Sequence, residues 1–217
     1  MQAEFDAAKT LLLDMDGTLL DLAFDNHFWL DTVPAEVAAQ LALSLEEARQ
    51  RVYALIESER GTMNWYDLAF WGRTFGLDMM ALKRRCPEPI RFIDGAESFL
   101  ARAKAAGFRL IIVTNSSQEL LNLKDEVTGI CSLVDASYSS SQFGEPKESA
   151  AFWSLFFSHT SEDPASCLLI DDSESVLRTA SDFGVGAVIG IRHPDSGRRP
   201  NALDGWASVD GVRDLLL

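Results

Sequence analysis

Four short runs of apolar residues predict buried β-strands. They cover residues 10–13, 110–113, 167–170 and 186–191, and turn-forming residues flank each of them. Because these runs do not alternate with polar residues, we expect strands that are covered on both faces, as in a parallel sheet. Residues 131–137 form a weaker fifth candidate.

Amphipathic segments between these runs predict helices. Residues 96–106 and 117–128 are each followed by a glycine, a common residue directly after a helix. Residues 146–157 carry apolar side chains at helical spacing, and residues 173–183 run from a capping Ser173 to Gly184. Strands and helices alternate from about residue 91 onward, which predicts an α/β fold with a doubly wound parallel sheet.

Residues 22–90 follow another pattern, with several helical signals and no convincing strand. Ser44 and Glu47 have the spacing of a capping box ahead of a helix over residues 48–56. Residues 62–75 and 78–86 are the next helical segments, ending before Gly76 and Pro87. We therefore expect a helical cap domain at residues 22–90, inserted into a core built from residues 1–21 and 91–217.

Composition and charge narrow the classes of partner. Of the 217 residues 47% are hydrophobic and 24% charged, which is typical of a globular protein. The formal net charge of −14 disfavours nucleic acid and anionic membranes as partners. No apolar run approaches the roughly 20 residues of a membrane-spanning helix. The N-terminus lacks a secretory pattern, and three distant cysteines fit no disulfide framework, so we expect a cytoplasmic protein.

Polar side chains that can carry chemistry occur at four places, three of them directly after a predicted strand. The carboxyl ends of parallel strands meet at one edge of a sheet, where ligands bind in such folds, so we expect these residues to converge. They are Asp14-Met15-Asp16-Gly17-Thr18, Thr114-Asn115-Ser116, Lys147 at the expected start of a helix, and Asp171-Asp172.

The expected cluster of carboxylates needs a cation, because several buried negative charges repel one another. Carboxylate oxygens suit a hard ion such as Mg²⁺, which also accepts a phosphate oxygen as a ligand. A lysine and a hydroxyl beside that ion complete a site for a phosphoryl group. One carboxylate can then attack phosphorus while another protonates the leaving oxygen. The residues therefore predict phosphoryl transfer.

The order DxDGT, hydrophobic-Thr-Asn, Lys, and hydrophobic-Asp-Asp resembles the haloacid dehalogenase (HAD) superfamily, and the helical insertion resembles its C1-type cap. The resemblance implies a Rossmann-like core and an aspartyl-phosphate intermediate. It implies that Asp14 is the nucleophile and Asp16 the general acid and base. The phosphate-binding residues would be Thr114, Asn115 (through its backbone) and Lys147. Mg²⁺ would be held by Asp14, the Asp16 carbonyl and the acidic pair Asp171-Asp172, of which Asp172 would be the direct ligand.

A narrower resemblance concerns the substrate. Five runs of the sequence are similar to the bacterial GMP/IMP nucleotidase branch of the superfamily. They are LLLDMDGTLLDLAFDNHFWLDTVP, MNWYDLAFW, FGEPKE, LLIDDSE and HPDSG. They extend into the expected cap, where such enzymes select their substrates. The resemblance implies a small phosphate ester as substrate, with purine 5′-nucleotides such as IMP and GMP as the leading candidates.

Other functions remain open at this level. A phosphatase of another small metabolite, such as a sugar phosphate, would share the same core. A dehalogenase needs no acid at position 16, whereas Asp16 is present here. A phosphorylation-switched receiver module is disfavoured by the order of the motifs and by the expected cap. A non-catalytic binding protein is disfavoured because no motif residue is missing. The aromatic residues of the insertion fit either purine stacking or the core of a helical bundle, and the bundle is favoured. They are Phe24, Phe28, Trp29, Trp65, Tyr66, Phe70 and Trp71.

Overall fold

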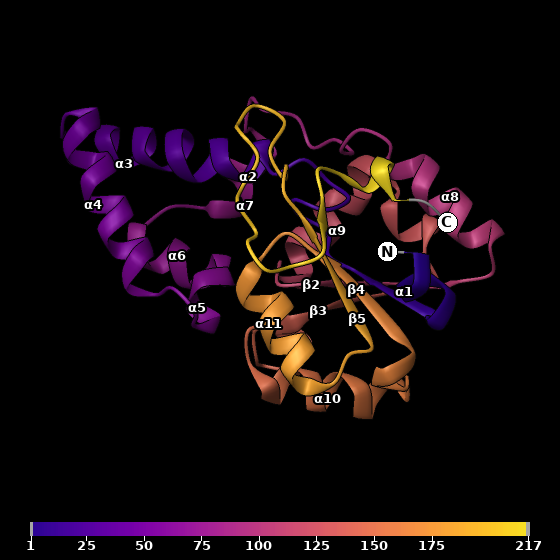
Figure 1. The fold of residues 1–217 in the computed structure, drawn as a ribbon. Helices are drawn as coiled ribbons and strands as arrows, with labels where there is room; N and C mark the ends of the chain where they lie inside the picture. Colours follow the sequence, from indigo (N-terminus) through magenta and orange to yellow (C-terminus); the bar gives the residue numbers. More distant parts are fainter. Residues whose placement is uncertain (1, 216–217) are drawn as a thin grey trace. The chain divides into compact units, whose positions relative to one another are not determined.

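The computed structural model describes residues 2–215 (Figure 1). The chain divides into two compact units, which we call the core unit and the insert unit. The core unit comprises the described residues up to Leu22 and from Ile90 onward, and the insert unit is Ala23–Pro89. The core unit carries all the motif residues that we expect to be catalytic.

The described part of the core unit contains a six-stranded sheet in the order β3-β2-β1-β4-β5-β6, and neighbouring strands run parallel. The first strand lies near the middle, with Leu13 opposite Ile112 on one side and Ile170 on the other. The predicted α/β class with a parallel sheet is confirmed. The strands are β1 (Thr10–Leu13), β2 (Arg109–Thr114), β3 (Ala136–Ser139), β4 (Cys167–Asp171), β5 (Ala187–Ile191) and β6 (Ser208–Val209).

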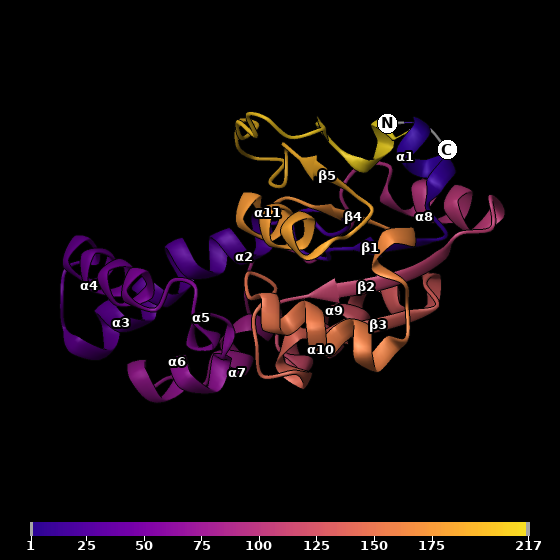
Figure 2. The same cartoon turned by 60° about the horizontal axis from the view of Figure 1, so that its bottom comes forward.

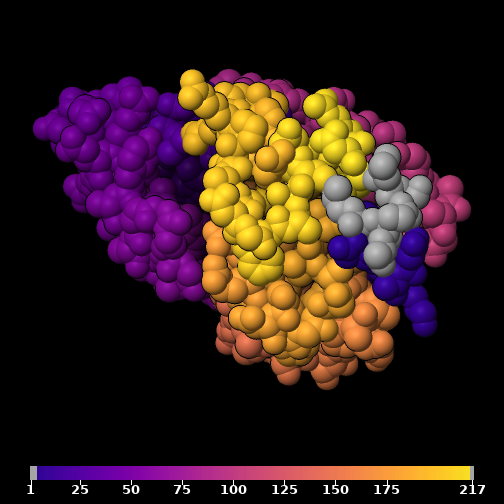
Figure 3. All heavy atoms as spheres, in the orientation of Figure 1, coloured from indigo at the N-terminus to yellow at the C-terminus, as the bar shows by residue number. Residues whose placement is uncertain are grey.

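Helices cover both faces of this sheet, which explains the unbroken apolar runs of its strands. Leu12 of β1 packs into a cluster with α10 (Ala150–Thr160) and α11 (Glu174–Phe183), and Figures 1 and 2 show these helices on the same face. Leu11 and Leu13 pack on the other face with α8 (Ala96–Ala105) and α9 (Gln118–Thr128), and Phe5 of α1 (Gln2–Ala7) joins them. In Figure 3 the orange and yellow C-terminal part forms a continuous surface on the visible face of the core unit.

The insert unit is helical, as its sequence predicts. Ser44 and Glu47 form the expected capping box at the start of α4. Its core is aromatic: Phe28 and Trp71 are almost fully buried, and Trp29 makes edge contacts with both rings. The helices are α2 (Ala23–His27), a π-helical turn (Phe28–Thr32), α3 (Val33–Leu41), α4 (Leu45–Ser58), α5 (Met63–Tyr66), α6 (Leu68–Phe75) and α7 (Met79–Arg84).

Three predicted elements need correction. The candidate strand 131–137 is a 3-10 turn (Ile130–Leu133) followed by β3, because Gly129 takes a left-handed conformation that turns the chain. The predicted helix 62–75 is two helices, separated where the Asp67 side chain accepts a hydrogen bond from the Ala69 backbone. The helix predicted from residue 146 begins at Ala150, where the Ser149 side chain caps it.

Candidate active site

The carboxyl ends of three neighbouring strands bring the candidate residues together. Asp14 directly follows β1, and its backbone N–H donates to the Ile170 carbonyl of β4 at 2.9 Å. Thr114 and Asp171 are the last residues of β2 and β4. All three are buried. The parallel register therefore places a carboxylate, a hydroxyl and a second carboxylate along one edge of the sheet.

Lys147 reaches this edge from a turn that precedes α10, not from the start of that helix as the sequence suggested. Its backbone N–H donates to the Asn115 side-chain oxygen at 2.9 Å, and its carbonyl accepts from the Trp153 indole at 2.8 Å. These two hydrogen bonds hold the turn outside the helix. They also connect the second and third motifs, and Asn115 contributes through its side chain.

The ammonium group of Lys147 lies between two carboxylates. It contacts Asp14 Oδ1, and it donates to Asp171 Oδ2 at 2.7 Å and to the Val113 carbonyl at 3.0 Å. Burial by itself would lower the pKa of Lys147, but the two carboxylates outweigh burial and raise it. The two carboxylates therefore favour the charged form of Lys147, although its side chain is buried.

Asp14, Asp171 and Asp172 form an acidic cluster, with one oxygen of each lying within 4.8 Å of the others. Burial raises the pKa of Asp14 to about 7, with Lys147 opposing the rise and Asp171 adding to it. Burial also raises the pKa of Asp171 and of Asp172, and the negative charge of Asp14 adds to the rise at Asp172. Three carboxylates against one lysine leave excess negative charge in a buried place.

This excess fits a divalent cation. The Oδ2 atom of Asp14 is buried and has no hydrogen-bond partner among the described residues, although buried carboxylate oxygens are normally satisfied. Mg²⁺ prefers oxygen ligands, and one or two protein carboxylates commonly hold it. The donor set of Asp14, Asp171 and Asp172 therefore suits Mg²⁺.

The glycine of the first motif allows the chain to pass close to this cluster. Gly17 has a positive φ of 93°, which favours glycine. A Cβ atom added there would lie 2.8 Å from the carboxyl carbon of Asp172 and 2.8 Å from the Pro194 side chain. A side chain at position 17 would therefore displace Asp172 or the loop that carries Pro194.

The carboxylate of Asp16 is directed to other partners. Its Oδ2 accepts a hydrogen bond from the Ser116 hydroxyl at 2.6 Å, and its Oδ1 contacts the Lys124 ammonium. Ser116 in turn donates its backbone N–H to the Thr114 hydroxyl at 3.0 Å. Lys124, a buried residue of α9, was missed by the sequence analysis. The available signal was its position three and four residues after two leucines, Leu121 and Leu120, on the apolar face of a helix.

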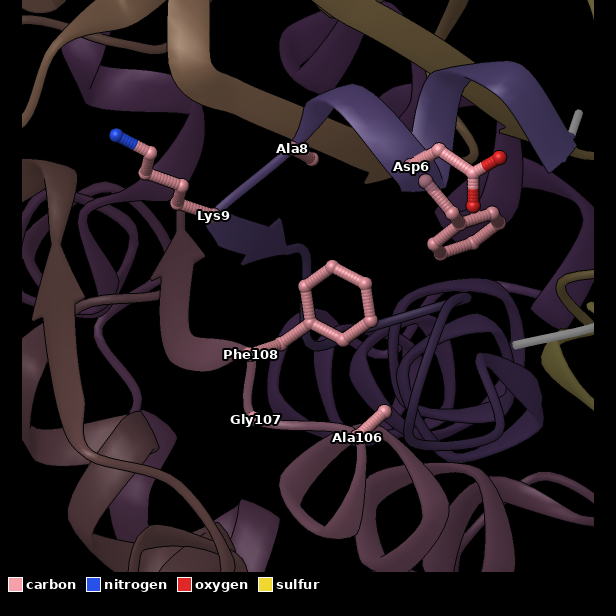
Figure 4. A pocket seen from close by; sticks show the side chains of 7 residues that line it. Asp6, Ala8, Lys9, Ala106, Gly107 and Phe108 are labelled. Carbon is pink, nitrogen blue, oxygen red and sulfur yellow. The ribbon is translucent and has the colours of Figure 1, made fainter.

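A surface pocket of about 400 Å³ lies elsewhere, near the start of β1 and β2 (Figure 4). Lys9 and Phe108, which directly precede these strands, help to line it. Since the candidate residues follow the same strands at their other ends, this pocket is separate from the acidic cluster.

The chain matches the model of the haloacid dehalogenase-like hydrolase family over residues 8–184. The chain belongs to this family. The matched range includes all four motifs and the whole insert unit. This HAD-family chain is therefore an enzyme, a hydrolase.

Individual relatives are consistent with this assignment. The chain is 35% identical over 207 residues to the GMP/IMP nucleotidase YrfG of Escherichia coli K12, covering 95% of this chain and 93% of the relative. The HAD phosphatase of Thermococcus onnurineus has a similar fold, with a TM-score of 0.78 and 24% identity over 94% of each chain. CbbY of Rhodobacter sphaeroides in complex with phosphate has a TM-score of 0.63 and 19% identity, covering 95% of this chain and 96% of CbbY. At these identities the two structures support the fold alone.

The described helices include none that is both long enough and apolar enough to span a bilayer.

Proposed function

We propose that this HAD-family phosphatase is a Mg²⁺-dependent phosphomonoesterase that hydrolyses purine 5′-nucleotides such as IMP and GMP. The observation that carries the proposal is the buried carboxylate of Asp14, which has one oxygen on Lys147 and the other without a hydrogen-bond partner among the described residues. Such a group has two oxygens next to a fixed positive charge, so one oxygen can attack an anionic phosphoryl group while the other binds Mg²⁺.

In the first half of the reaction, each of the two carboxylates of the DxD motif has one role. An oxygen of Asp14 forms a bond to phosphorus while the bond between phosphorus and the ribose oxygen breaks. The carboxylic acid of Asp16 gives its proton to that leaving oxygen, so a nucleoside and an aspartyl phosphate result. Lys147, Thr114 and the Asn115 backbone hold the phosphoryl oxygens, and Lys147 supplies the charge that balances them.

The second half returns the enzyme to its starting state. The Asp16 carboxylate takes a proton from a water molecule as the water oxygen attacks phosphorus. The bond between phosphorus and Asp14 then breaks, which releases inorganic phosphate and regenerates the carboxylate. Because Asp16 alternates between acid and base, it must stay close to the leaving oxygen and then to the water.

Asp14, the Asp16 backbone carbonyl and Asp172 would hold Mg²⁺, with Asp171 nearby. The ion would supply positive charge that stabilises the phosphoryl oxygens and keeps the Asp14 carboxylate ionised.

The substrate assignment is supported by the similarity to the E. coli GMP/IMP nucleotidase, which extends over nearly the whole of both chains. It therefore includes the insert unit, Ala23–Pro89, which we propose to be the cap domain that selects the leaving group. The aromatic side chains of this unit that are almost fully buried serve its core. The partly exposed aromatic residues named in the sequence analysis are the better candidates for contacting a purine: Trp29, Trp65, Tyr66 and Phe70.

Phosphate release from a panel of esters tests this proposal. The panel contains IMP, GMP, AMP, pyrimidine monophosphates and several sugar phosphates, each assayed with Mg²⁺ and with EDTA. We expect the highest kcat/KM for IMP and GMP, with activity lost in EDTA and in Asp14→Asn. A preference for sugar phosphates would refute the substrate assignment and keep the mechanism, whereas activity that survives in Asp14→Asn would refute the mechanism.

A further inference from the structure

Two side chains from different elements hold the carboxylate of Asp16. The Lys124 ammonium, which comes from α9, contacts Oδ1, and the Ser116 hydroxyl, which comes from the segment after β2, donates to Oδ2 at 2.6 Å. Each oxygen of this carboxylate therefore has its own donor, and the two donors together fix the plane of the group as well as its position.

Both donors are themselves held in place. The Ser116 backbone N–H donates to the Thr114 hydroxyl at 3.0 Å, and the Ser116 carbonyl accepts from the Ser139 hydroxyl of β3 at 2.6 Å. Lys124 is 1% exposed, and its helix packs on the sheet through Leu121. Burying an ammonium group is costly without a negative partner, so a lysine at this position of the helix requires a carboxylate at its tip.

The core unit thus contains two separate lysine–carboxylate groups at one edge of the sheet. Lys147 joins Asp14 and Asp171, whereas Lys124 joins Asp16. The second group lies outside the acidic cluster, which consists of Asp14, Asp171 and Asp172.

We propose that Lys124 is a positioning residue, which together with Ser116 orients the Asp16 carboxyl group for proton transfer to and from the reacting oxygens. This inference rests on the proposed role of Asp16 as general acid and base. When Asp16 gives its proton to the leaving oxygen, the carboxylate that results stays between the same two donors. It is then in place to accept a proton from the attacking water.

The dependence on the leaving group separates this role from a structural one. An alkoxide such as ribose O5′ needs a proton as it leaves, whereas p-nitrophenolate leaves without one. A displaced Asp16 therefore slows the first half of the reaction for an alkyl phosphate and leaves that of p-nitrophenyl phosphate nearly intact.

The test compares Lys124→Met and Ser116→Ala with wild type in rapid-quench, single-turnover assays of leaving-group release with Mg²⁺. The substrates are p-nitrophenyl phosphate and IMP, or the alkyl phosphate of the panel that the wild type hydrolyses fastest. Lys104→Met is the matched control, because Lys104 is an exposed lysine of α8. In Lys124→Met we expect the rate of leaving-group release from the alkyl phosphate to fall about 10- to 100-fold. This loss is part of the rate enhancement that general acid catalysis contributes. The smaller change Ser116→Ala should show a weaker loss in the same direction.

A double-variant comparison shows whether Lys124 acts through Asp16. In the Asp16→Asn background, Lys124→Met should cause no further loss, because the group that it orients is already absent. Equal losses for both substrates, or losses that multiply in the double variant, would overturn the inference. So would full activity of folded Lys124→Met. If Lys124→Met does not fold, as judged by circular dichroism, Ser116→Ala decides by the same criteria.

A different result would refute the proposed function. If Asp16→Asn alone releases the alkyl leaving group at the wild-type rate, Asp16 is not the acid, and the proposed mechanism is wrong regardless of Lys124. If Asp16→Asn is slow while folded Lys124→Met and Ser116→Ala are both normal, the mechanism stands and the positioning role is wrong.

Discussion

Removing the charge of Asp14 should stabilise the metal-free enzyme at alkaline pH. The pKa of this carboxyl group is about 7 in the folded protein against an ordinary value of 3.8, mainly because the group is buried. Between pH 3.8 and about pH 7, Asp14 therefore keeps its proton in the folded state and loses it in the unfolded state. Stability is unaffected by this group below the lower value, falls as the pH rises through the interval, and stays reduced above the upper value.

The size of the effect follows from the same two pKa values. The difference of about 3 pKa units corresponds to roughly 4 kcal/mol at pH 8 and to less than half of that at pH 5. Asp14→Asn keeps the shape of the side chain and has no charge at either pH. In EDTA the variant should therefore melt roughly 8–16 °C above wild type at pH 8, with a much smaller difference at pH 5.

Thermal melting followed by circular dichroism, in EDTA at both pH values, measures this difference. Asp204→Asn is the matched control, because Asp204 is exposed and its replacement should change the melting temperature little at either pH. A metal-free Asp14→Asn variant that melts at or below the wild-type temperature at pH 8 would refute the electrostatic reasoning. An equal gain at pH 5 and pH 8 would do the same, since the gain would then not come from ionisation.

Three further predictions concern the same edge of the sheet. Adding Mg²⁺ should raise the melting temperature of wild type, and a hundredfold excess of the ion over its Kd corresponds to a stabilisation of about 2.7 kcal/mol. The melting temperature of Asp14→Asn should rise much less. Equal rises in the two proteins would show that the ion binds elsewhere. Lys147→Met should abolish turnover and cost about 3–5 kcal/mol of metal-free stability at pH 8, measured by urea unfolding, because Asp14 and Asp171 lose a shared counter-charge. Gly17→Ala should lower kcat and Mg²⁺ affinity, measured by titration, because the new Cβ would lie 2.8 Å from Asp172; a fully active variant would show that the cluster tolerates the displacement.

Much of the core unit could be predicted from the sequence because its signals are local. A strand of a parallel sheet that is covered on both faces is a short apolar run, and the run at Thr10–Leu13 gives the observed β1 with the same bounds. The convergence of Asp14, Thr114 and Asp171 follows from the direction of the strands. The strand predicted at 131–137 was wrong in its first half, because Cys131 and Leu133 are apolar residues of a 3-10 turn that pack against the core and look like strand residues.

The parts that were missed depend on contacts between distant residues. Lys124 and Asp16 are 108 positions apart, and only the packing of α9 on the sheet brings them together. The turn that carries Lys147 is held by Asn115 and Trp153, neither of which signals a delayed helix start in the sequence. A lysine on the apolar face of a helix does indicate that a buried negative partner exists, but it does not identify the partner.

The central claim is that Asp14 becomes covalently phosphorylated, and trapping the phosphoenzyme tests it most directly. Enzyme mixed with IMP and Mg²⁺ is quenched in acid after one turnover time, reduced with borohydride, digested and analysed by mass spectrometry. We expect the modification, a reduced aspartyl side chain, on the peptide that contains the DxD motif and at Asp14 itself, absent from Asp14→Asn and from enzyme without substrate. Rapid hydrolysis of IMP with Asp14 unmodified, or with the same modification at Asp16, would contradict the account.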